Sequence, residues 1–131
     1  MRTLAQKRAE YALEKVLLVK NKKDFRPFVA GAPAGILQNG LGQTLAFWLA
    51  KGTNKDGKIK EDDKHIELFD IVKDWMSWQR NDVHNNFAQE RDRMVFVKEL
   101  SKMKLHKYLA VQNETLALLE WVKRFAAADL Q

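Results

Sequence analysis

The chain has 131 residues, a formal net charge of +6 and no cysteine. It therefore forms no disulfide, thiol nucleophile or cysteine-ligated metal site, and no run of eighteen apolar residues is present to span a membrane. With this length and 46% hydrophobic residues, we expect one domain over residues 1–131 with a real core, located in the cytoplasm.

The positive charge is concentrated in the first half of the chain. Residues 1–60 carry 12 Lys and Arg against 4 Asp and Glu, a balance of +8, whereas residues 61–131 carry 11 against 13, a balance of −2. This asymmetry favours a polyanionic partner on one side and a protein partner on the other. Lysines that merely keep the protein in solution would explain the basicity equally well.

The first two helices are expected near the N-terminus. Thr3 should cap a helix that runs to about Lys20, and Asp24 should cap the second helix. Gly31 and Pro33 should stop or kink that second helix, as a C-terminal glycine and an early proline do.

Residues 32–51 contain an Asn39-Gly40 break between two apolar helical segments. Asn and Gly tolerate left-handed backbone angles, so this pair can end one helix and begin the next. After the break, large apolar residues recur at helical spacing, namely Leu41, Leu45, Trp48 and Leu49. No side chain in this block can do chemistry, which indicates a scaffold.

Further helices are expected over about 63–80, 87–103 and 105–128, with a loop over 52–63 and a polar break over 81–86. No segment alternates with the period of a strand. We therefore predict an all-α, single-domain bundle of about five to six helices with a long central C-terminal helix.

The last expected helix is apolar on two sides. Its length of about 36 Å matches the diameter expected for a compact chain of this size. Such a helix is either central or presents one side to another subunit, and we favour the central position. The two faces consist of Leu105, Leu109, Leu116 and Leu119, and of Tyr108, Val111, Leu118, Val122 and Phe125.

Three cations on the first helix recur every seven residues, Arg8, Lys15 and Lys22, and lie inside its apolar arc. A cation at such a position is costly unless its charged head reaches water or an anion. One interpretation is that the side chains extend to water at the rim of the core. The other is a phosphate-facing stripe with Tyr11 beside it, whose contacts would carry no sequence preference.

Patterns that suggest metal binding or catalysis are weak. The loop over 52–63 imitates part of an EF-hand, but Gly52 stands where the first carboxylate belongs, so we interpret it as a solvated loop. The acidic and histidine side chains over 82–92 (Asp82, His84, Glu90 and Asp92) lack the spacing of metal ligands. No HExxH motif or nucleophile elbow occurs. We expect the tryptophans to be core residues: Trp48, Trp75, Trp78 and Trp121.

Three blocks of the sequence resemble one protein family in their order and character. They span nearly the whole chain and read QKRAEY, APAGILQNGLGQTLAFWLAK and KYLAVQNETLALLEWVKRFAAA. On these blocks the chain resembles the small helical subunit of the Cmr complex, the type III-B CRISPR–Cas effector that uses a guide RNA to find and destroy foreign RNA. The segments over 52–63 and 81–92 match nothing in that resemblance.

The resemblance implies a non-catalytic role without a cofactor. Such subunits stack head to tail as a minor filament beside the backbone subunits and line the channel for the guide–target duplex. The implied partners are the backbone and large subunits of the Cmr complex, further copies of this chain and the guide RNA–target RNA duplex, with no membrane. Two basic pairs match the family, Lys7-Arg8 before Glu10-Tyr11 and Lys123-Arg124 after Trp121.

With the stripe on the first helix, the predicted nucleic-acid-binding residues are therefore Lys7, Arg8, Lys15, Lys22, Lys123 and Arg124. No catalytic residue and no metal ligand is predicted. The alternative function is that of a free-standing helical adaptor between proteins, whose positive charge is incidental.

Overall fold

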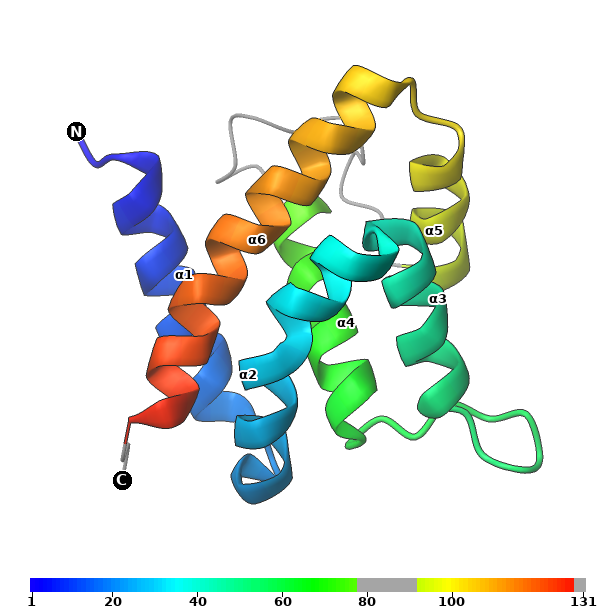
Figure 1. Ribbon diagram of the computed structural model, residues 1–131. Coiled ribbons are helices and arrows are strands. Elements are labelled where there is room, and N and C mark those ends of the chain that lie inside the picture. The colour runs from blue at the N-terminus through cyan, green and yellow to red at the C-terminus, as the bar shows by residue number, and fades with distance from the viewer. Residues whose placement is uncertain (78–91, 129–131) are drawn as a thin grey trace.

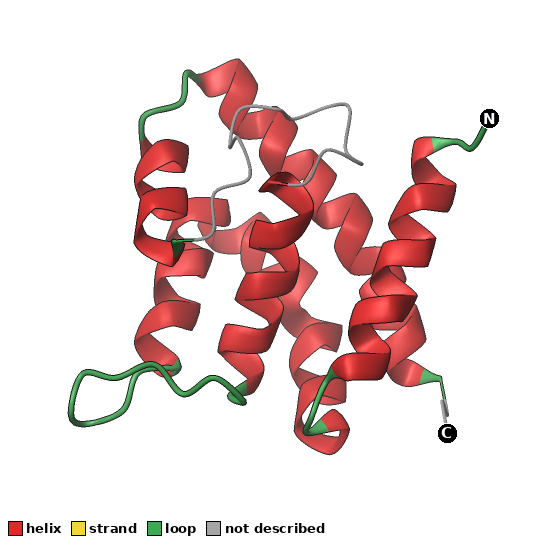
Figure 2. Cartoon of the chain, turned by 180° about the vertical axis from the view of Figure 1, so that it is seen from behind, coloured by secondary structure: helices red, strands yellow, loops and turns green. Residues whose placement is uncertain are grey.

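The computed structural model describes residues 1–77 and 92–128. Within them the chain is all-α, as predicted (Figures 1 and 2), and its only β-type pairing is an isolated bridge between Thr53 and Ile59. The helices of this part of the chain are α1 (Leu4–Leu18), α2 (Lys22–Asn39), α3 (Leu41–Lys51), α4 (Lys64–Ser77), α5 (Arg93–Ser101) and α6 (Leu105–Ala127).

Helix α6 is the central element of the bundle. It crosses the molecule and packs chiefly against α1 and α2, while α3, α4 and α5 complete the other side (Figure 1). The face with Val111, Leu118 and Val122 is fully buried, which confirms the predicted central position. The first turns of the helix are different, because Leu105 and Leu109 are 71% and 42% exposed.

The predicted break between α2 and α3 is confirmed, and Gly40 makes it. Its φ of +83° is strained for any residue with a side chain, and its N–H donates to Ile36 O (2.7 Å) to close α2. The N–H groups at the start of α3 have no acceptor within their own helix and donate to side chains of α6. Leu41 N donates to Gln112 Oε1 and Gly42 N to Tyr108 Oη, both at 2.9 Å. Side chains of α6 therefore cap α3.

Two expectations about α2 are wrong. Its N-cap is Asn21, whose Oδ1 accepts from the N–H of Asp24 (3.2 Å), so Asp24 lies in the first turn and is not the cap. The predicted stop is wrong too, because the helix continues past Gly31 and through Pro33 to Asn39. A proline inside a helix costs about 3 kcal/mol, which the burial of a continuous apolar stripe offsets. That stripe consists of Phe25, Val29, Ala32 and Ile36.

The remaining expectations are met in part. Thr3 caps α1 through a capping box with Gln6. Trp48 and Trp75 are core residues, as predicted, whereas Trp78 lies outside the described residues. The predicted break over 81–86 and the expected start of the next helix near 87 also lie outside the described residues. In the described part, α5 begins at Arg93, and Asp92 is its N-cap.

Candidate nucleic-acid interface

Helices α1 and α6 carry most of the predicted site residues. They lie side by side and run in the same direction, so both end beside the start of α2 (Figure 1). Arg26 of α2 ties this junction together, because its guanidinium donates to two carbonyl oxygens at the end of α6 at 3.0 and 3.3 Å. We call this region the basic end; its exposed cations are Lys22, Lys23, Arg26, Lys123 and Arg124.

The other three predicted cations are spread along α1. Lys7 and Lys15 lie about 12 Å apart along the helix axis, at 1.5 Å per residue. The Nζ atom of Lys15 lies 5.4 Å from the ring centroid of Tyr11. Tyr11 itself is buried and donates its hydroxyl proton to Ile71 O (2.6 Å), so its ring belongs to the core. The structure thus groups three of the six predicted residues and separates the rest.

Arg8 has a partner inside the protein. Its Nε and Nη2 atoms donate to the two carboxylate oxygens of Glu114 at 2.5 and 2.6 Å. The Arg8 side chain is 18% exposed and that of Glu114 only 3%. Trp75 Nε1 donates to the same carboxylate (2.9 Å). The hydrogen bond to Glu114 raises the pKa of Arg8 above its ordinary value although burial opposes it, so the guanidinium stays charged and holds α1 against α6.

Sequence reasoning did not identify Glu114, although a signal was present. Glu114 is the one carboxylate on the buried face of α6, between Val111 and Leu118. A buried carboxylate requires a cation or several hydrogen-bond donors. Arg8 is likewise a charge within an apolar arc. Each of these two residues therefore requires a partner of opposite charge, and the other residue can supply it.

Lys22 is the first residue of α2, so the predicted stripe on the first helix is wrong at this position, because α1 already ends at Leu18. Lys22 also makes contacts within the protein. Its Nζ donates to the carbonyl oxygens of Leu17 (3.1 Å) and Val19 (2.9 Å), at the C-terminal end of α1. A cation at a helix C-terminus satisfies these carbonyls and complements the helix dipole. The rest of the side chain is exposed, so Lys22 combines a capping role with a place on the surface of the basic end.

The end of α6 presents aromatic rings beside its cations. Trp121 and Phe125 are stacked, with centroids 5.9 Å apart and an interplanar angle of 25°. The Arg124 guanidinium lies 5.8 Å from the Trp121 ring. Both Lys123 and Arg124 are exposed, so their charged groups are accessible to an anion.

The described residues assemble no group of three or more His, Cys, Asp and Glu side chains that could hold a metal ion. In the loop after α3, Asn54 Oδ1 accepts the N–H groups of Asp56 and Lys58, which makes a turn satisfied by its own atoms. Asp92 serves as a helix cap; the acidic and histidine residues over 82–90 lie outside the described part of the chain. Nor does any helix of that part have the length and apolar character to cross a bilayer.

The fold and these side chains define a small, basic, all-α protein. The chain belongs to the Cas_Cmr5 family of CRISPR-associated proteins, because the model of that family matches residues 4–129. It is therefore a subunit of the Cmr complex of CRISPR defence, in a family of structural small subunits.

A solved structure agrees with this assignment. A CRISPR-associated Cmr5 family protein from Thermus thermophilus is 28% identical to this chain, with a TM-score of 0.67, and the match covers 100% of both chains. The similarity thus extends over the whole helical bundle.

Proposed function

We propose that this chain is a non-catalytic, RNA-binding structural subunit of the Cmr complex. In this proposal, copies of it stack as a minor filament beside the backbone and large subunits and line the channel that holds the guide–target duplex. The observation that carries the RNA-binding part is the basic end, where exposed cations from α2 and α6 gather with Trp121 and Phe125.

The chemistry of the basic end suits a phosphate backbone. Exposed Lys and Arg side chains neutralise phosphates and release counterions, and such contacts carry no sequence information. A guide-directed complex needs none from this subunit, because base pairing identifies the target. Lys123 and Arg124 are the strongest candidates, since neither donates to another group in the described residues.

The remaining predicted residues contribute differently to the proposal. Lys22 can contact phosphate while it caps α1. Lys7 and Lys15 extend the positive surface along α1. A phosphate contact by Arg8 stays a prediction without support from its geometry, because its guanidinium is bonded to Glu114.

The first experiment is RNA binding by the purified protein, followed by fluorescence anisotropy at several salt concentrations. We expect sequence-independent binding, micromolar or weaker as for non-specific nucleic-acid binding, that weakens steeply with salt. The variant K123A/R124A should lower the salt slope by about two, one unit for each lost phosphate contact.

A matched control is K55A/K58A, which removes the same charge from exposed positions in the loop after α3. If both double variants weaken binding equally, the basic end is not a specific site. Absence of RNA binding would favour the alternative, a helical protein–protein adaptor.

The second experiment tests assembly. Native mass spectrometry of the tagged protein purified from its host should detect a guide RNA together with several Cmr subunits. The exposed apolar side chains of Leu105 and Leu109 on α6 are candidates for contacts with those subunits. A single protein partner without RNA would contradict the proposal.

A further inference from the structure

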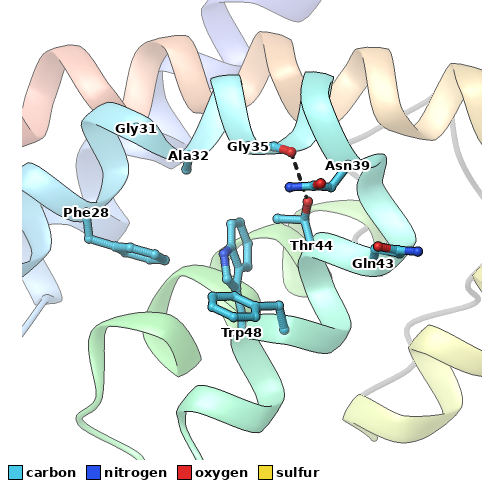
Figure 3. A pocket seen from close by; sticks show the side chains of 9 residues that line it. Phe28, Gly31, Ala32, Gly35, Asn39, Gln43, Thr44 and Trp48 are labelled. Atoms are coloured by element: carbon cyan, nitrogen blue, oxygen red, sulfur yellow. Dashed lines mark hydrogen bonds between the residues drawn. The ribbon is translucent and has the colours of Figure 1, made fainter.

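A hollow of about 500 Å³ lies between α2 and α3. We call it the α2–α3 hollow. Phe28 lies at one end of it and Asn39 and Gln43 at the other, with Trp48 between the two helices (Figure 3). Its lining contains no charged residue: Phe28, Gly31, Ala32, Gly35, Asn39, Gln43, Thr44, Phe47 and Trp48.

The α2 side of the hollow is open because two of its residues lack side chains. A Cβ atom added to Gly31 or Gly35 would meet no atom within 4 Å, apart from its neighbours in the helix. A flat ring can therefore approach the α2 backbone closely. Thr44 borders the same space, with its hydroxyl directed to the carbonyl oxygens of Gly40 (2.8 Å) and Gly35 (3.4 Å, dashed in Figure 3).

Aromatic rings from both helices border the hollow, Phe28 of α2 and Phe47 and Trp48 of α3. Phe28 packs edge-on against Trp48, with centroids 5.6 Å apart, and the His65 ring lies 4.6 Å from Phe28. Phe47 is different, because it is 55% exposed. An exposed phenyl ring next to a hollow offers a face on which another ring can stack.

Two lysines lie beside aromatic rings that line the hollow. Lys51 Nζ lies 5.5 Å from the Phe47 centroid, and Lys64 Nζ lies 5.9 Å from the Phe28 centroid. Lys64 is the first residue of α4, where a cation is unfavourable with respect to the helix dipole; helix stability therefore does not explain its presence. The nearby carboxylate of Asp63 is already bonded to His65 and Lys60.

The far end of the hollow offers amide groups. Asn39 and Gln43 are exposed, and their side chains form no hydrogen bond with any other described residue. An amide both donates and accepts, which is the pattern that the edge of a nucleobase requires.

We propose that the α2–α3 hollow binds one unpaired nucleotide. The base stacks on Phe47 and reaches Asn39 and Gln43 with its edge, while its phosphate lies near Lys51 and Lys64. A hollow of about 500 Å³ is of the size that holds a small ligand. A protein helix docked at this site would have to cover about 800 Å² of this chain's surface. An apolar side chain of that helix could fill the hollow, but it would form no contact with the charges of the two lysines or with the hydrogen-bonding groups of the two amides.

The test compares F47A with L37A in the purified full-length protein. Both substitutions remove an exposed apolar side chain, but only Phe47 lines the hollow. F47A should weaken binding of a labelled single-stranded RNA by about 5- to 160-fold, the effect of one lost base–aromatic stack, and leave binding of duplex RNA unchanged. L37A should change neither. Equal binding of single-stranded RNA by the two variants would overturn the proposal.

The source of the nucleotide is decided by NMR of the Trp48 indole N–H. A saturable shift with uridine or adenosine monophosphate alone would identify a free nucleotide as a ligand, and a shift only with the RNA strand would identify the strand. No shift with either would overturn the site. So would an F47A protein that keeps RNA binding but no longer enters the Cmr complex, because the hollow would then hold a protein partner.

This site is independent of the proposed function, and the two fail separately. K123A/R124A should weaken binding of single-stranded and duplex RNA alike, whereas F47A should affect only the single strand. An effect of the first variant without an effect of the second would overturn the hollow and leave the basic end standing. The reverse result would leave the hollow standing and overturn the basic end.

Discussion

Arg8 and Glu114, 106 residues apart in the chain, form a bidentate ion pair that joins α1 to α6. The N···O distances are 2.5 Å from Nε and 2.6 Å from Nη2. The carboxylate also accepts from Trp75 of α4, so one buried acceptor connects three helices. Because α1 and α6 carry five of the six predicted RNA-binding residues, this pair helps to set how those residues are arranged on the surface.

Arg8→Ala should lower the free energy of unfolding by about 3 kcal/mol. The substitution leaves the Glu114 charge buried with Trp75 as its remaining side-chain donor, and an uncompensated buried charge has a cost of this order. Urea denaturation followed by tryptophan fluorescence measures the change. The control is Arg2→Ala, which breaks the exposed Arg2–Glu10 pair and should cost less than about 1 kcal/mol. Equal losses would mean that the buried pair contributes no more stability than the exposed one.

The double variant R8M/E114Q separates the structural role of Arg8 from a phosphate contact. The Gln side chain keeps an acceptor for Trp75, and the uncharged pair needs no compensation, so most of the stability should return. We expect the salt slope of RNA binding to equal that of the wild type, since the guanidinium is engaged by Glu114. A slope lower by about one unit would instead establish a phosphate contact by Arg8.

Gly40→Ala should lower the free energy of unfolding by about 2 kcal/mol. The φ of +83° and ψ of 156° at this position are nearly restricted to glycine, and an added Cβ would lie 3.3 Å from Tyr108 Oη. Thermal unfolding measures the loss. Gly57→Ala is the matched control, because its φ is +78° but its Cβ would meet nothing within 4 Å. A loss at Gly57 as large as that at Gly40 would mean that crowding against Tyr108 contributes nothing.

Much of the fold could be predicted because helix signals are local. Apolar spacing and the Thr3 cap placed α1, and the same spacing placed α6 to within one residue of its end. Local signals failed in α2, where burial of the stripe from Phe25 to Ile36 against the rest of the bundle outweighs the breaking tendency of Pro33. Such a balance depends on tertiary packing, which spacing alone does not contain.

The candidate site could be predicted only in part, for a related reason. The sequence identified Arg8 as a charge in an apolar arc. Which residue of α6 faces it depends on how far α1 is shifted along α6 when the two helices pack. Two helices at opposite ends of the chain set that shift through their packing. The α2–α3 hollow was not predicted either, because its lining residues come from both α2 and α3 and meet only in the folded chain.

Glu67→Gln should stabilise the protein at pH 7 by no more than about 1 kcal/mol, because it removes a partly buried charge whose loss of hydration is only partly compensated. Glu67 Oε2 accepts from Lys20 N (3.1 Å), whereas its buried Oε1 has no hydrogen-bond partner in the described residues. Burial raises the pKa of Glu67, and the nearby Asp62 and Asp63 charges add to this effect, although the Lys20 N–H and charge oppose it. The neutral amide keeps an acceptor for Lys20 and removes the buried charge.

The sign of the pH dependence follows from the raised pKa. Between the ordinary pKa of the unfolded chain and the higher pKa of the folded chain, the folded protein binds more protons, so the stability of the wild type falls as pH rises through this window. The advantage of E67Q should therefore be complete above the window and disappear below about pH 4, where the carboxyl group is neutral in both states. Chemical denaturation at pH 4 and pH 7 measures it, with Glu120→Gln on the exposed face of α6 as the control. An advantage of equal size at both pH values would show that burial of the Glu67 charge is not its cause.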